Sequence, residues 1–112
     1  MKPSRDSPIF SRMQVLLIWV VRTTRRFPRD QRFGLAQRIL QQAFRLEDQL
    51  VTAAVDRENQ KDRLLEADIA LTGLRRSLLL AHEMGFLSDG QLRHATEMLA
   101  EIGRLLGGWR KR

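Results

Sequence analysis

The chain has 112 residues, which is enough for one domain and too few for two. It contains no cysteine, which excludes disulfides and thiolate chemistry and fits a reducing cytoplasm, the expected location. The 20 Lys and Arg residues outnumber the 13 Asp and Glu residues, giving a net charge of +7, and both ends of the chain are basic. This excess suggests a polyanion, an acidic protein surface or an anionic membrane as partner.

Residues 1–8 contain two prolines and no periodicity, and we interpret them as a flexible arm. The first helix is predicted over residues 9–26, where apolar residues from Met13 to Val21 follow helical spacing. Ile18 and Trp19 make further faces of this helix apolar, which predicts that it is buried on more than one side and that the chain self-associates. The alternative is that Trp19 covers a neighbouring helix of the same subunit. No stretch reaches the roughly 18 apolar residues of a membrane span, and arginines follow this segment where a signal peptide would have a cleavage site.

Phe27-Pro28 breaks the first helix, and a second helix is expected to start at Pro28 or Arg29 and to run to about residue 55. Asp30 would then lie in its first turn. Its inward stripe runs from Leu35 to Ala53 or Ala54, and Phe33 and Phe44 are expected to add bulk to it. The polar segment 56–61 is the predicted turn to a third helix.

The third helix is predicted over residues 60–84 and should end at Gly85, a C-cap glycine. Ser88 and Gln91 have the spacing of a capping box, which opens a fourth helix over 89–106. No strand pattern occurs. The predicted fold is all-α: an antiparallel up-down four-helix bundle over residues 9–109, followed by a basic tail over 110–112 and assembled into a ring or barrel homo-oligomer.

The C-terminal stretch 101–109 has three glycines. Gly107 is expected to cap the fourth helix in a left-handed conformation, with Trp109 folding back beyond it. Gly103 lies inside the helix, where glycine costs roughly 1 kcal/mol, so another backbone is expected to approach it closely. We assign Gly103 and Trp109, with Ile18 and Trp19, to the oligomer interface.

Residues for catalysis or metal binding are scarce. The two histidines lack the Glu-x-x-His context of di-metal bundle sites, and two solvated side chains explain them. No nucleophile signature and no phosphate-binding glycine loop occur. We therefore expect no enzyme activity, no catalytic residue, no metal and no cofactor.

Arginine carries the remaining functional signal, because its planar fork suits phosphate and carboxylate recognition. For any single arginine, a solvated basic face is a sufficient explanation, but a cluster presents a summed charge to polyanions. Arg38 and Arg75 could instead be structural, each pairing with an acid such as Glu101. Phe27 and Trp109 are the aromatic residues beside basic runs, so backbone binding is favoured over sequence readout. The candidate binding residues are Arg22, Arg25, Arg26, Arg29 and Arg32 near the first turn, Arg75 and Arg76, and Arg104, Arg110, Lys111 and Arg112.

Three stretches, residues 26–29 (Arg-Phe-Pro-Arg), 74–76 (Leu-Arg-Arg) and 101–109, resemble the accessory variability determinant proteins of diversity-generating retroelements. These belong with the four-helix proteins encoded in ribosomal-RNA intervening sequences. The resemblance implies a homopentamer of four-helix protomers without a catalytic site. It also implies binding to a reverse transcriptase and to RNA and DNA, in support of mutagenic cDNA synthesis. Two alternatives stay open: a stand-alone nucleic-acid-binding bundle of the intervening-sequence type, and a protein that lies on a membrane surface through its first helix.

Overall fold

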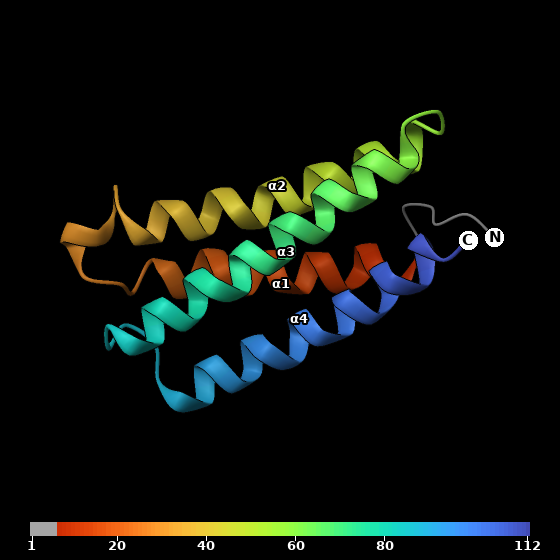
Figure 1. Cartoon of the computed structure of the whole chain (residues 1–112). Helices are drawn as coiled ribbons and strands as arrows, with labels where there is room; N and C mark the ends of the chain where they lie inside the picture. Colours follow the sequence, from red (N-terminus) through yellow and green to blue (C-terminus); the bar gives the residue numbers. More distant parts are fainter. Residues whose placement is uncertain (1–6) are drawn as a thin grey trace.

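The computed structural model describes residues 7–112, which form four α-helices, one short 3-10 turn and no strand (Figure 1). The all-α prediction is therefore confirmed, whereas most of the predicted N-terminal arm, residues 1–6, lies outside the described part. Ser7 and Pro8, which were assigned to that arm, are the N-cap and first residue of the first helix. The elements are α1 (Pro8–Thr24), η1 (Arg29–Gln31), α2 (Leu35–Val55), α3 (Gln60–Glu83) and α4 (Asp89–Arg110).

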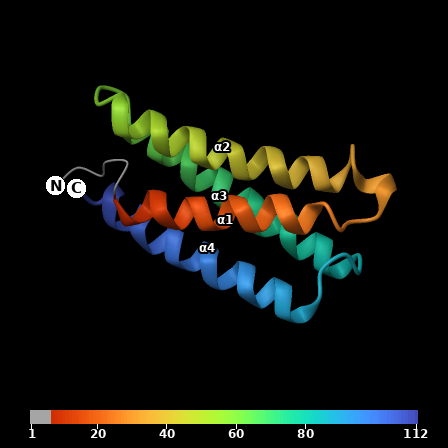
Figure 2. The same ribbon diagram turned by 180° about the vertical axis from the view of Figure 1, so that it is seen from behind.

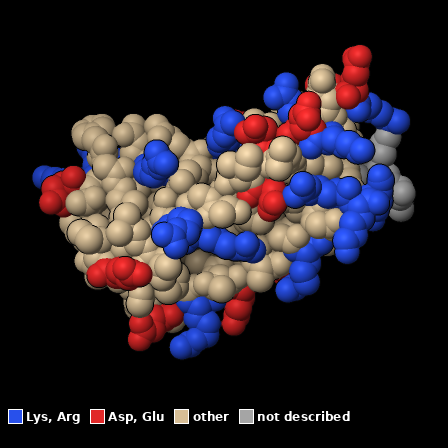
Figure 3. All heavy atoms as spheres, viewed as in Figure 1, with Lys and Arg blue, Asp and Glu red and all other residues tan. Residues whose placement is uncertain are grey.

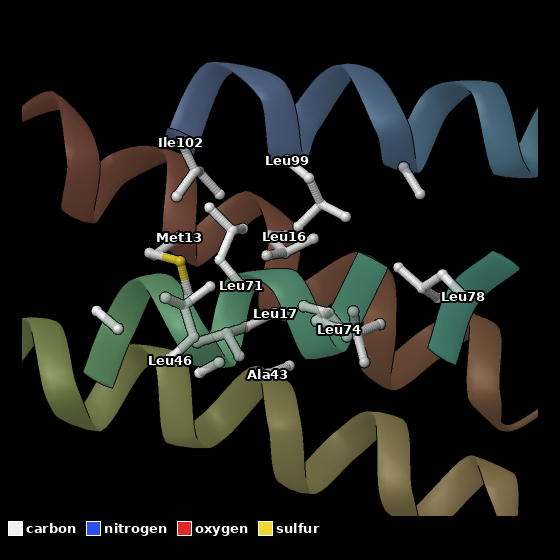
Figure 4. Close-up of a cluster of buried hydrophobic side chains, with 14 of the residues drawn as sticks. Met13, Leu16, Leu17, Ala43, Leu46, Leu71, Leu74, Leu78, Leu99 and Ile102 are labelled. Atoms are coloured by element: carbon white, nitrogen blue, oxygen red, sulfur yellow. The ribbon is translucent and has the colours of Figure 1, made fainter. Parts of the chain in front are cut away.

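The four helices enclose one apolar core, to which each contributes the stripe that the helical spacing predicts (Figure 4). Leu16, Leu46, Leu74 and Leu99 come from four different helices and are all but inaccessible to solvent. Burying a leucine side chain contributes roughly 1.5–3 kcal/mol, so this shared core is the main stabilising term. It holds the surface side chains of all four helices in fixed relative positions.

The bundle measures 42 × 24 × 20 Å, and its turns are divided between its two ends. The start of α1, the end of α4 and the α2–α3 turn lie at one end, and the α1–α2 and α3–α4 turns lie at the other (Figures 1 and 2). At the first end the Phe10 and Trp109 rings meet edge to face with centroids 6.4 Å apart. At the second, the Phe27 and Phe86 rings are 5.6 Å apart, which joins the two turns.

The α3–α4 turn follows its local sequence signals. Gly85 has a φ of 84°, and its N–H donates to the His82 carbonyl while the Phe86 N–H donates to that of Ala81. These are the two bonds of a Schellman C-cap. Ser88 Oγ then accepts from the Gln91 N–H at 3.1 Å, and Gln91 Oε1 accepts from the Ser88 N–H at 2.8 Å. Both the predicted C-cap and the predicted capping box are confirmed.

The α1–α2 connection differs from the prediction, because α2 begins at Leu35 and not at Pro28 or Arg29. Asp30 lies in the separate turn η1, and Gly34, the N-cap residue of α2, separates that turn from α2. Phe33 is consequently 80% exposed instead of facing inward. Phe44, also assigned to the inward stripe, is 46% exposed.

The end of α4 also differs from the prediction. The helix continues through Gly107 and Gly108 to Arg110, and within residues 7–112 only Gly85 has a positive φ. Trp109 continues the inward stripe of Ile102 and Leu106 and is buried. Burial of this indole outweighs the roughly 1 kcal/mol that each helical glycine costs. Trp109 is therefore a core residue of α4, not a plug beyond a glycine cap.

Candidate nucleic-acid interface

Five arginines surround the α1–α2 turn, and all are exposed. Two elements and the link between them supply these arginines, because α1 ends at its C-cap Arg25, Arg29 begins η1 and Arg32 is the C-cap of that turn. In the described part of the chain, no carboxylate lies within ion-pair distance of any of them. Their charge therefore remains available to a partner. We call these residues the turn cluster: Arg22, Arg25, Arg26, Arg29 and Arg32.

Other arginines are neutralised by carboxylates of the protein itself. Arg12 Nε lies 2.6 Å from Glu101 Oε1, which ties the start of α1 to α4. Among the candidate binding residues, Arg110 Nη1 lies 2.8 Å from an oxygen of Asp68 on α3. Two further pairs join Arg45 to Glu66 at 3.1 Å and Arg63 to Asp56 at 4.0 Å. Exposed pairs of this kind add little stability, but they cancel charge locally.

Arg75 has a structural contact, although with a different partner from the one suggested. Its Nη2 donates to the Leu99 carbonyl of α4 at 3.2 Å, while Glu101 is the partner of Arg12. A Cβ atom at Gly103 would lie 3.0 Å from this same Nη2. Gly103 thus makes room for a guanidinium of α3, and within the described chain side chains, not a backbone, approach it.

The remaining candidates do not join the turn cluster. Arg104, Lys111 and Arg112 lie toward the end of α4, at the opposite end of the bundle. Figure 3 shows that basic residues gather at the end of the bundle where α4 ends, interspersed with acidic ones. Helix α1 runs along the far side of the molecule in Figure 3, and Figure 2 shows that side. The predicted basic residues therefore form two separate groups, with Arg75 and Arg76 between them on α3.

A pocket of about 510 Å³ opens within the turn cluster, between α1, η1 and α2. The sequence pattern did not predict this pocket, because a helix starting at Pro28 leaves no place for η1. The sequence feature that pointed to the pocket was Phe27-Pro28, an apolar pair between arginines. The lining of the pocket combines apolar and basic side chains: Val21, Thr24, Arg25, Phe27, Pro28, Arg29, Arg32, Ala36 and Leu40.

Comparison with known families gives a match over residues 9–112, nearly the whole chain, to the family described as bAvd-like. The chain belongs to this bAvd-like family. The resemblance to accessory variability determinants is thereby confirmed, and the family is one of accessory proteins. No curated protein matches the chain. None of the helices within residues 7–112 is long and apolar enough to cross a membrane.

In this bAvd-like chain the predicted interface residues differ in accessibility. Ile18 is 45% exposed and lines a groove of about 480 Å³ between α1 and α2, together with Phe44 and Arg22. Trp19 is half-buried on the other side of α1, where its ring meets that of His94 edge to face at 6.1 Å. The other histidine also has a contact, because His82 Nε2 lies 2.6 Å from Asp89 Oδ1. Neither histidine is therefore simply solvated. Ile18 is thus the predicted interface residue with the most free surface.

An acidic residue lines a second hollow between α1 and α2 of this bAvd-like protein. Glu47 is half-buried there with Phe10, Gln14 and Val51, and its Oε1 has no hydrogen-bond partner in the described structure. Burial raises the pKa of the Glu47 carboxyl, and the nearby Asp48 charge raises it further. An ionised carboxyl repels phosphate, so this second hollow is unsuited to a polyanion.

Proposed function

We propose that this protein is a non-catalytic accessory scaffold of a diversity-generating retroelement. In this role it binds the element's reverse transcriptase, and it binds RNA and DNA through the turn cluster, in support of mutagenic cDNA synthesis. Membership of the bAvd-like family supports the accessory role. The observation that carries the nucleic-acid site is that five exposed arginines share one end of the bundle without an ion-pair partner among residues 7–112.

The free-energy cost of binding a phosphate differs between paired and unpaired arginines. A guanidinium that is already paired must give up its carboxylate before it can bind a phosphate, and Arg110 would have to leave Asp68 in this way. Among residues 7–112 the turn cluster has no such partner to lose. Each phosphate that it neutralises releases condensed counterions, so binding weakens as salt rises. Phosphates carry no base information, so RNA and DNA of different sequence bind alike.

Assembly is the second part of the proposal. We propose that antiparallel four-helix protomers form a closed ring, with the pentamer inferred from family resemblance. The exposed Val15 and Ile18 on the outer face of α1 support a subunit contact there, because contiguous exposed apolar side chains usually mark an interface. Rotational symmetry would repeat the turn cluster around the ring and multiply its field.

Charge reversal of the turn cluster tests the nucleic-acid site. We expect the triple variant Arg25→Glu, Arg26→Glu and Arg29→Glu to lose most binding to DNA and RNA in fluorescence anisotropy. It should also flatten the dependence of log K on log salt by about two to three units, since each lost phosphate contact removes about 0.7–0.9. Far-UV circular dichroism should stay unchanged, because these side chains lie outside the core.

The matched control is Arg57→Glu with Lys61→Glu, compared with Arg25→Glu with Arg29→Glu. Both double variants change the net charge equally, and Arg57 and Lys61 are exposed at the opposite end of the bundle without an ion pair among residues 7–112. The control variant should keep most of the affinity. If the triple turn variant binds as tightly as wild type at low salt while Arg75→Glu with Arg76→Glu does not, the site lies on α3 and the turn cluster is a solvated face.

Partner binding needs its own measurement. The reverse transcriptase encoded beside this gene should co-elute with the protein in size-exclusion chromatography after nuclease treatment. Failure to co-elute, with nucleic-acid binding intact, would favour the stand-alone nucleic-acid-binding alternative.

A further inference from the structure

We infer that the pocket at the α1–α2 turn takes an unpaired nucleobase, so that this protein prefers single-stranded nucleic acid over duplex. The inference rests on the proposed function and names the form of nucleic acid that the turn cluster recognises. It requires a cavity for a base, cations for the flanking phosphates and a surface for stacking.

The cavity has the size and chemistry for a base. Its volume of about 510 Å³ lies within the range of roughly 300–1,000 Å³ typical of pockets for small organic ligands. Its lining includes the side chains of Val21, Phe27, Pro28 and Leu40, which suit the apolar faces of a planar ring. A paired base in a duplex is stacked and cannot enter, whereas an unpaired base can be splayed out into such a site.

The pocket is fixed by packing behind it. Phe27 is buried, and its ring meets that of Phe86 at 5.6 Å, so the α3–α4 turn supports the pocket. Thr24 Oγ1 donates to the Val20 carbonyl at 2.8 Å. Because this bond uses its proton, the Thr24 oxygen can only accept, as it would from the amino group of a base. A fixed pocket keeps the entropy cost of ligand binding low.

Cations lie where the flanking phosphates would be. Arg25, Arg29 and Arg32 all line the pocket and come from different positions around it, namely the end of α1 and both ends of η1. The described structure contains no ion pair for these three. A strand that places one base in the pocket therefore brings its backbone against free guanidinium groups.

An exposed aromatic residue stands beside the pocket. Phe33 is 80% exposed, and the guanidinium of Arg32 lies 5.4 Å from its ring centroid. Sequence analysis considered Phe27 and Trp109 for stacking, but both are buried. Phe33 can therefore stack with the base that follows or precedes the base in the pocket. Surfaces that bind single strands combine arginines with aromatic side chains in this way.

The decisive probe is an oligonucleotide without bases. We expect wild-type protein to bind a short single strand of mixed sequence roughly five- to hundredfold more tightly than an abasic strand of the same length. This is the typical loss of affinity when alanine replaces an aromatic side chain that stacks on a base. Both strands carry the same phosphates, so this ratio isolates the bases. A matched duplex should bind more weakly than the base-carrying strand at the same salt concentration.

Two variants locate the effect without changing the charge. Leu40→Trp fills the pocket and Phe33→Ser removes the stacking ring, and each should reduce the preference for the base-carrying strand while leaving binding of the abasic strand unchanged. Val51→Trp, on the same helix but away from the pocket, is the control and should keep the full preference.

Two failures are distinguishable. If wild type binds the abasic strand or the duplex as tightly as the base-carrying strand, the inference is wrong. A protein side chain then becomes the better occupant of the pocket. Binding of RNA and DNA through the charge of the turn cluster still stands in that case. If the turn-cluster triple variant retains all binding, the proposed function itself fails.

Discussion

Alanine substitution of two helical glycines is a sensitive test of how α4 ends. Gly107 and Gly108 lie inside α4, and among residues 7–112 a Cβ atom added at either would meet no atom within 4 Å beyond its chain neighbours and the local helix backbone. Glycine in a helix interior is less stable than alanine by roughly 0.8–1.0 kcal/mol. The double variant Gly107→Ala and Gly108→Ala should therefore raise the free energy of unfolding by about 1–2 kcal/mol, toward the lower end because the last turns of a helix fray.

The magnitude can be expressed as a melting temperature. With an unfolding entropy of about 2.1 cal/mol/K per residue, a chain of this length has roughly 0.24 kcal/mol/K, so Tm should rise by about 4–8 °C. Thermal unfolding followed by far-UV circular dichroism measures this, and urea titration checks the sign. Repeating the scan at two protein concentrations separates an effect on the protomer from a clash in an assembly.

Gly85→Ala is the matched control. A Cβ atom there also meets no other residue within 4 Å in the described part of the chain, its chain neighbours aside, but φ is +84°, so alanine is strained by the backbone alone. It should lower Tm by about 4 °C or more, since the strain is roughly 1–2 kcal/mol. If Gly107→Ala lowers Tm as Gly85→Ala does, then Gly107 is left-handed and α4 ends there.

Two further predictions concern the α1–α2 face. In sedimentation velocity at micromolar concentration the wild type should be oligomeric, and Ile18→Glu should shift it toward the monomer. Val55→Glu, an exposed control at the end of α2, should not. A wild type that stays monomeric would refute the assembly proposal. Glu47→Gln should stabilise the protein at neutral pH, because burial lifts the folded pKa of Glu47 above its ordinary value of 4.5, so ionisation disfavours the folded state. The gain in the free energy of unfolding should be complete above the folded pKa of Glu47 and should vanish below pH 4.5. Urea titrations at neutral pH and below pH 4.5 measure it. The same gain at both would show that ionisation of Glu47 is not its cause.

The helices and their inward faces were predictable because they depend on local spacing. Leu46, Leu74 and Ile102 each belong to an apolar stripe with helical spacing on their own helix, and each is buried. The α3–α4 turn was equally predictable, since Gly85 and the Ser88–Gln91 pair form their bonds with near neighbours. Where sequence neighbours determine the geometry, sequence reasoning suffices.

The errors arose where distant contacts override local signals. Gly107-Gly108 is a strong local stop signal, yet burial of Trp109 against the core keeps α4 helical. The residue types of the candidate site were predictable, but their partners were not, because Arg12 reaches Glu101 across 89 positions and Arg110 reaches Asp68 across 42. The pocket likewise depends on three elements whose relative placement no local pattern encodes.

The neighbouring positions of the start of α1 and the end of α4 have a consequence for the topology of the chain. Phe10 and Trp109 are in ring contact, and the Arg12–Glu101 pair lies two helical turns from the end of α4. A short flexible peptide can therefore join these ends, and the chain can be reopened at the α2–α3 turn, which lies at the same end of the bundle. Such a circular permutant would begin with α3 and finish with α2, with the α1–α2 connection uncut. It would place both new ends at the end of the bundle opposite the turn cluster, so a surface tether or a fluorophore attached there would leave the turn cluster unobstructed.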